Sequence, residues 1–223
     1  MQNEKNINIG EKVIEFLQRN RKGILILTGV IVVFFVGLVV HLALQDTNNK
    51  KAIIKVEELS RRYEDMRFLI TESYYEADLE TLLVDLQTFA KNKKGYGPSK
   101  AWSIVGQIHS SRKDWQKSKD AWLKAARSGN KTYLAPMALF NAAAAAEELG
   151  NIDEAIELLQ KCIAHTFEFP AAPRAQFSIG RLYEKQNNYS AAMDAYRTLL
   201  IDWQDAPLYQ NLARSRIVAI EIR

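Results

Sequence analysis

The histidines and the cysteine are the side chains of this sequence best suited to chemistry, but their spacing does not assemble a site. His41, His109 and His165 are far apart, and none stands at the spacing of metal ligands. Cys162 is the single cysteine, so it cannot form a disulfide within the chain. His109 and Cys162 fall at helix-packing positions, where we expect buried structural roles, with a reactive thiol as the alternative for Cys162.

Acidic pairs and glycine loops give no better case for catalysis. The acidic pairs at residues 147–148 and 153–154 flank a polar turn, where solvation explains them. No glycine-rich phosphate loop and no nucleophile elbow occurs. We therefore predict no enzyme: no catalytic residue, no metal ion, no cofactor and no small-molecule substrate. An enzyme with an unrecognised site is the alternative.

The charge balance argues against a nucleic-acid partner. The 223 residues carry a formal net charge of +4, and residues 1–44 contain five Lys or Arg and three Asp or Glu, which account for two of these charges. Beyond residue 44 the chain holds 25 basic and 23 acidic residues. A basic face that could follow a phosphate backbone is therefore not expected.

Residues 24–44 form a long apolar stretch near the N-terminus. Its 21 residues contain no charge, and as a helix they would span about 31 Å, close to the hydrocarbon thickness of a bilayer. A buried core helix seldom runs this long with every face apolar. A cleaved signal peptide is the stronger alternative, but no A-x-A site follows. We predict one transmembrane helix over residues 24–44, in contact with the lipid bilayer.

The flanks of this stretch predict its orientation. Basic residues on the short N-terminal side are Lys5, Lys12, Arg19, Arg21 and Lys22. The other side begins with five uncharged or acidic residues before Lys50, so the N-terminus should stay in the cytoplasm. Within residues 1–23, an apolar face at positions 13, 14, 16 and 17 predicts a short amphipathic helix at the membrane interface, or an extension of the membrane helix.

Three windows with one shared pattern follow, beginning at residues 99, 136 and 173. Small residues at 106, 143 and 180 would let two helices of a hairpin approach closely, and large residues at 122, 159 and 196 would fill the space between hairpins. This pattern resembles the tetratricopeptide repeat (TPR), with repeats at 99–135, 136–172 and 173–205. Gln176 departs from it, because a large apolar residue is usual there. A generic helical bundle is the alternative.

Further helices should flank the repeats. Helical spacing of apolar residues over 53–70 and 79–90 predicts a degenerate hairpin within residues 45–98 that caps the array. Residues 206–223 predict a C-terminal capping helix. The expected fold is all-α: a single N-terminal transmembrane helix, then a TPR-type α-solenoid of helical hairpins.

First helices of TPR hairpins line a concave groove in this family. By register, the residues here that would face a partner protein are Ser103, Gln107, Phe140, Arg174, Phe177 and Arg181. Phe140 and Phe177 are candidate apolar anchors, and Arg174 and Arg181 could pair with acidic groups. Two alternatives stay open: the C-terminal helix fills the groove, or the two phenylalanines pack internally.

The whole layout resembles the YfgM-like family of bacterial inner-membrane proteins. The resemblance is carried by the lead EKVIEFLQRNRKG, by the noncanonical hairpin after the anchor, and by the segment KNKKGYGPSKAWSIVGQI. It implies an ancillary subunit of the Sec translocon, anchored in the inner membrane with its repeats in the periplasm. Its partners would be translocon subunits, periplasmic chaperones or exported proteins. A scaffold for outer-membrane or cell-wall assembly is the alternative function.

Overall fold

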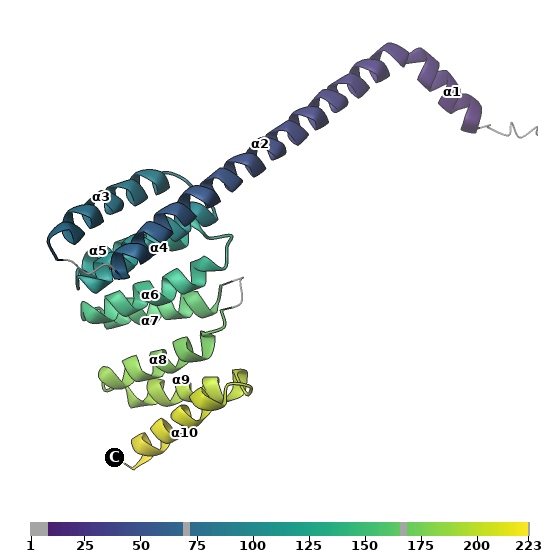
Figure 1. Ribbon diagram of the computed structural model, residues 1–223. Helices are drawn as coiled ribbons and strands as arrows, with labels where there is room; N and C mark the ends of the chain where they lie inside the picture. The colour runs from purple at the N-terminus through teal and green to yellow at the C-terminus, as the bar shows by residue number, and fades with distance from the viewer. Residues whose placement is uncertain (1–8, 69–71, 166–168, 223) are drawn as a thin grey trace, which may run out of the picture. The chain divides into compact units, whose positions relative to one another are not determined.

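Helices make up all the regular structure in residues 9–68, 72–165 and 169–222, which the computed structural model describes (Figure 1). The expected all-α class is confirmed. Ile70 of the expected cap and Lys5 of the N-terminal flank lie outside these residues. The helices are α1 (Ile9–Arg19), α2 (Arg21–Phe68), α3 (Glu72–Ala90), α4 (Tyr96–Ser111), α5 (Trp115–Ser128), α6 (Leu134–Glu148), α7 (Ile152–Ile163), α8 (Ala172–Lys185), α9 (Tyr189–Asp202) and α10 (Pro207–Glu221).

The chain has two compact units, residues 1–50 and residues 51–223. In the first unit, α1 ends at a turn on Asn20, whose side-chain amide donates to the Phe16 carbonyl at 2.9 Å. Segment 9–19 is therefore a helix of its own. Its apolar side chains Val13, Ile14 and Leu17 are exposed.

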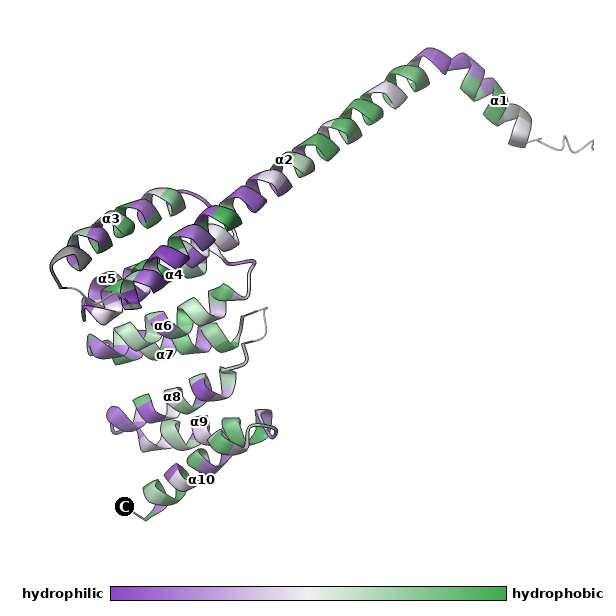
Figure 2. Ribbon diagram, in the orientation of Figure 1, coloured by the Kyte–Doolittle hydropathy of each residue, from purple (hydrophilic) through white to green (hydrophobic). Residues whose placement is uncertain are grey.

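Helix α2 carries the long apolar stretch. Among the described residues it is the one helix long and apolar enough to cross a membrane, judged by length and composition: its most apolar window has a mean hydropathy of 3.0, and none of that window is buried. Figure 2 shows the hydrophobic colour concentrated there. The helix does not end with the apolar stretch but runs on to Phe68, and Asp46 and Lys50 pair at 2.7 Å one turn apart just beyond the stretch. The boundary predicted at residue 45 thus lies inside a helix.

Three hairpins in the second unit follow one another at the predicted period. Their second helices begin at Trp115, Ile152 and Tyr189, each 37 residues after the one before. From α3 to α10, each helix packs against its neighbours in the sequence, as Figure 1 shows. The apolar core accordingly falls into three successive clusters rather than one. This serial packing is that of a solenoid.

The turn inside each hairpin repeats the same geometry. Lys113, Gly150 and Asn187, spaced by 37 residues, all have φ between 59° and 80°. The next residue in each turn donates its amide to a carbonyl five residues back, at 2.9 Å in all three turns. This 6→1 bond closes the first helix. Lysine and asparagine tolerate the left-handed conformation less readily than glycine, so the bond and the packing of both helices hold it there.

Contact between a ring and a glycine closes the first and third hairpins. A β-carbon added at Gly106 would lie 2.7 Å from the Trp122 ring, and one added at Gly180 would lie 2.4 Å from the Tyr196 ring. Both rings are buried. In the second hairpin, Ala143 stands at the equivalent position, and the facing residue is the smaller Leu159. The small residue and the large residue are therefore matched in size within each repeat.

Gln176 is the position where the sequence pattern failed, and the structure gives the reason. Its side chain is 8% exposed, and its amide nitrogen donates to the Ala195 carbonyl of α9 at 2.9 Å. A buried amide with a hydrogen-bond partner avoids the desolvation penalty of an unpaired one. The glutamine thus links α8 to α9 where an apolar residue would only fill space.

Size matching predicts a coupling between Gly180 and Tyr196. Gly180→Ala forces a methyl group against the ring, which we expect to destabilise the fold by about 1–2 kcal/mol after the gain in helix propensity is deducted. In a Tyr196→Leu background, which copies the Ala143 and Leu159 pair, the same change should be neutral or stabilising. Urea denaturation of the full-length protein in detergent, followed by circular dichroism, measures both. An equal penalty in the two backgrounds would refute the size matching.

Candidate partner-binding groove

A hollow of about 200 Å³ lies between the first helices of the second and third repeats. Three of the six residues predicted to face a partner line it: Phe140 on α6, and Arg174 and Arg181 on α8. The complete lining is Phe140, Ala143, Ala144, Glu147, Leu159, Arg174, Ser178, Arg181 and Leu182. Residues 34 positions apart on α6 and α8 come together here, as the hydrogen bond from Arg181 to Glu147 shows.

Phe140 provides the apolar surface of this hollow. Its ring is half-buried, with its centre 5.7 Å from the ring centre of Phe169. The Arg174 guanidinium lies over the same ring at 5.1 Å. Arg174 is exposed and, among the described residues, takes part in no ion pair. The hollow thus presents an aromatic face beside an unpaired cation, which suits an apolar side chain next to a carboxylate.

Arg181 is occupied by an acidic residue of the neighbouring helix. Its guanidinium makes two bonds to Glu147, at 2.7 and 2.5 Å, and Lys185 adds a contact at 3.5 Å. These cations hold the pKa of the Glu147 carboxyl below its usual value, with the Arg181 hydrogen bonds as the largest cause. Arg181 therefore ties α8 to α6 and neutralises Glu147, and sequence register did not reveal this partner.

Phe177 lies apart from the hollow, against the C-terminal helix. Its ring packs 5.4 Å from that of Tyr196 and 6.3 Å from that of Tyr209 on α10. Arg216 of α10 is also paired with Glu184 of α8. Helix α10 thus packs on Phe177, one of the residues that register assigned to a partner, while no α10 residue lines the hollow at Phe140.

Ser103 and Gln107, the two predicted residues of the first repeat, do not line the hollow. Ser103 is 3% exposed, and its hydroxyl donates to the Ser99 carbonyl at 2.9 Å within α4. Gln107 is exposed on α4 but stands outside the hollow. Phe169 was missed by sequence reasoning, because it precedes α8 in an interrepeat connection where no helical period applies.

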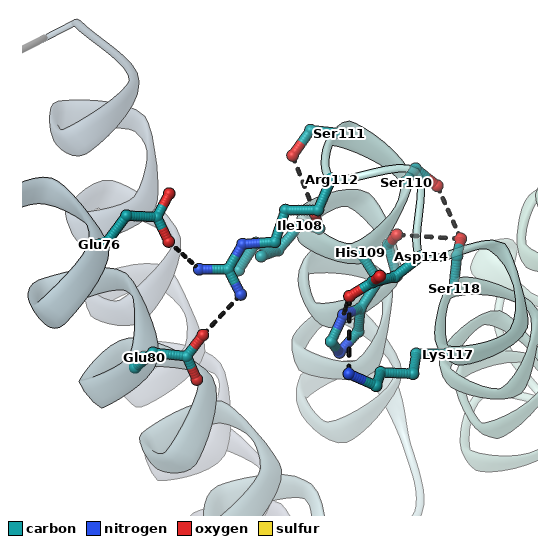
Figure 3. Close-up of polar contacts among 11 residues, drawn as sticks. Glu76, Glu80, Ile108, His109, Ser110, Ser111, Arg112, Asp114, Lys117 and Ser118 are labelled. Carbon is teal, nitrogen blue, oxygen red and sulfur yellow. Dashed lines mark hydrogen bonds and ion pairs between the residues drawn. The ribbon is translucent and has the colours of Figure 1, made fainter. Parts of the chain in front are cut away.

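His109 lies in the last turn of α4, next to the connection that leads to α5 (Figure 3). His109 is 8% exposed, and its Nδ1 atom lies 3.5 Å from the Asp114 carboxylate, too long for a hydrogen bond. Burial lowers the pKa of His109 below 6.5, and nearby Lys117 acts in the same direction. Arg112 reaches across to two carboxylates of α3, at 2.5 and 2.6 Å. The arrangement is that of a neutral packed histidine.

Cys162 likewise occupies a packing position. Its side chain is fully buried, and its thiol donates to the Pro136 carbonyl at 3.1 Å. Burial raises the pKa of the Cys162 thiol to about 12, so the nucleophilic thiolate is scarce near neutral pH. Among the described residues, no three His, Cys, Asp or Glu side chains gather in a way that could hold a metal ion.

Comparisons with known proteins agree on the repeats. Residues 106–166 and residues 146–215 each match a family model described as a tetratricopeptide repeat. A TPR repeat-containing protein of Treponema pallidum (strain Nichols) is 35% identical over 147 residues, covering 64% of this chain and 60% of that protein. The chain thus spans less than two thirds of that relative's length.

Solved structures share the fold. A crystal structure of a single-substitution form of the nearly identical TPR-like repeats from a putative kinesin light chain of Podosopora anserina superposes with a TM-score of 0.51. The alignment covers 76% of this chain and 94% of that one, at 14% identity. At this identity the likeness concerns the fold alone.

Burial of His109 predicts how the stability of the repeats depends on pH. Because its folded pKa lies below 6.5, the unfolded chain binds the proton more readily, so this contribution is complete above pH 6.5 and is lost as the pH falls below it. The melting temperature should therefore fall more between about pH 7.5 and about pH 5.5 in the wild type than in His109→Gln. Identical pH profiles for the two proteins would contradict the burial of a neutral imidazole.

Proposed function

Because this chain is a tetratricopeptide-repeat protein, we propose that it is a membrane-anchored adaptor that binds another protein in the groove at Phe140. TPR repeats are protein-interaction modules, and stacked hairpins leave the faces of their first helices available to a partner. The single observation that carries the proposal is the hollow between α6 and α8, where an aromatic ring and an unpaired guanidinium lie together.

Chemistry of the hollow suggests what would enter it. A volume of about 200 Å³ suits one or two side chains rather than a free metabolite. Phe140 would contact an apolar side chain, and Arg174 would bind a carboxylate that stands beside it. Since Arg181 already neutralises Glu147, the hollow carries a net positive charge from Arg174. An extended or helical segment of a partner with an apolar residue next to an acidic one fits this arrangement.

Membrane anchorage is the second part of the proposal. The unburied apolar part of α2 and the basic residues before it support an anchor in a bacterial inner membrane, with the N-terminus in the cytoplasm and the repeats in the periplasm. From this position the adaptor would serve protein export, linking the translocon with periplasmic chaperones, as the resemblance to the YfgM-like family suggests. A scaffold for outer-membrane or cell-wall assembly would use the same anchor and groove.

Crosslinking from inside the hollow tests the groove. A photo-crosslinking amino acid at Ala144, an exposed lining residue, should capture a partner in intact membranes. Phe140→Ala with Arg174→Ala should weaken that capture about tenfold or more, as expected for a central contact worth ~1.4 kcal/mol or more.

The matched control removes one apolar and one cationic side chain from a part of the surface outside the hollow. Ile201 and Arg197 are exposed on α9, so Ile201→Ala with Arg197→Ala removes one apolar and one cationic side chain outside the hollow. Undiminished capture in a folded Phe140 and Arg174 double variant would remove the groove proposal. Identified adducts separate the functions: translocon subunits and chaperones support export, whereas envelope-assembly proteins support the alternative.

Topology has its own test. Trypsin added outside spheroplasts should cleave the repeat unit, for which Lys93 and Lys94 offer exposed sites in the connection between α3 and α4. Tagged protein should lose its C-terminal tag while a cytoplasmic marker stays intact. Protection of the tag until the membrane is lysed would overturn the periplasmic placement.

A further inference from the structure

A cleft of about 740 Å³ opens on another side of the solenoid, between α3 and α5. These are second helices of successive hairpins, whereas the Phe140 hollow lies between first helices. The cleft is lined by Gln87, Thr88, Ala90, Lys91, Asn92, Lys93, Lys94, Trp102, Lys124, Arg127 and Ser128. Five of these residues are basic and none is acidic.

The five cations of the cleft are unpaired, unlike their neighbours. Lys100, Arg112 and Lys119 each contact a carboxylate, Lys119 at 2.5 Å from Glu154. Within the described part of the chain, no carboxylate pairs with any of the five. The helix C-termini of α3 and α5 also reach the cleft, but each offers only about −0.5 charge, so a positive excess of roughly four charges remains.

Aromatic rings fix two of the ammonium groups. The Lys124 ammonium lies 4.5 Å from the centre of the Trp102 ring, and the Lys93 ammonium lies 4.9 Å from that of Phe89. Trp102 is half-buried and is the residue of α4 that lines the cleft. Each of these two ammonium groups therefore has an aromatic ring beside it, and Trp102 adds apolar surface to the cleft.

The basic loop is anchored to the opposite wall. Gly95, with φ of 108°, donates its amide to the Ser128 carbonyl at the end of α5, at 2.8 Å. Asn92 adopts φ of 58°, and the Lys93 amide donates back to Ala90 at 3.2 Å. These bonds fix the path of the loop that carries the lysines. A ligand would therefore find the cleft already formed, which lowers the entropy lost on binding.

The next repeat shows that this cleft is not a general product of the fold. One period of 37 residues further on, the residues equivalent to Trp102, Lys124 and Arg127 are Leu139, Lys161 and Ala164. Lys161 is paired with Glu157 at 2.6 Å. Neither the aromatic floor nor the unpaired charge recurs there, so both are specific to the first repeat.

We propose that this cleft binds an acidic segment of a partner protein, independently of the groove at Phe140. Its volume lies within the range of about 300–1,000 Å³ typical of ligand sites. Amide and hydroxyl groups of Gln87, Asn92 and Ser128 suit a peptide backbone between the charges. A nucleic acid needs basic charge along an extended path, whereas the chain beyond residue 44 is nearly balanced. A bilayer surface is flat and does not enter a hollow.

Binding of a short fluorescein-labelled peptide of alternating glutamate and serine tests the proposal, with the full-length protein in uncharged detergent and anisotropy as the readout. Lys124→Glu with Arg127→Glu should weaken binding by about tenfold or more, since two attractive contacts become repulsive. Lys91→Gln with Lys94→Gln, on the other wall, should weaken it several-fold. Added salt should weaken wild-type binding, because exposed charges are screened.

The matched control reverses the same charges on later helices. Lys161→Glu with Arg197→Glu changes the net charge equally and should leave the affinity within about twofold of the wild type. Circular dichroism establishes that all variants are folded. Equal loss in the control, absence of peptide binding, or binding of anionic lipid vesicles or an oligonucleotide that the peptide does not displace would each overturn the assignment.

Discussion

The seating of a large side chain on a small residue within each hairpin is the contact on which the array depends. Trp122 lies against Gly106 and Tyr196 against Gly180, with no space for a β-carbon at either glycine. The distance between the two helices of one hairpin sets where the next hairpin can pack, because each hairpin buries its apolar faces against its neighbours. A change of size at one member of a pair therefore shifts the packing of a whole repeat.

This packing decides which faces are left for partners. First helices α6 and α8 lie near enough for Glu147 and Arg181 to pair across them, and the hollow at Phe140 lies beside that pair. Residues of the second helices α3 and α5, of the connection after α3 and Trp102 of α4 line the basic cleft. At the end of the array, α10 packs on Phe177 through Tyr209. One solenoid thus offers two chemically different surfaces and covers a third.

Sequence periodicity predicted the hairpins well because each is specified locally. The small residues predicted at 106, 143 and 180 recur every 37 residues, and the turn residues at 113, 150 and 187 follow the same period. Groove residues were harder to predict, because the repeat register shows which face of a helix a residue lies on but not which side chain of another helix contacts it. Arg181 was predicted to meet a partner, yet Glu147 of the same chain occupies it. Gln176 looked like a misfit until the Ala195 carbonyl supplied its hydrogen bond.

The sequence by itself determined the apolar helix, the all-helical class and the 37-residue period of the small and large residues, since these depend on spacing along one chain. The structure decided that Trp122 and Tyr196 lie on the glycine of their own hairpin, whereas the sequence pattern had placed the large residues between hairpins. Tertiary structure alone decided that Phe140 lines a hollow while Phe177 packs against α10, and that Arg174 is unpaired while Arg181 is not. It also gathered Lys91 to Lys94 with Lys124 and Arg127 around Trp102. Whether a side chain is paired or exposed depends on which residues from distant segments contact it. The stacking of the hairpins determines those contacts.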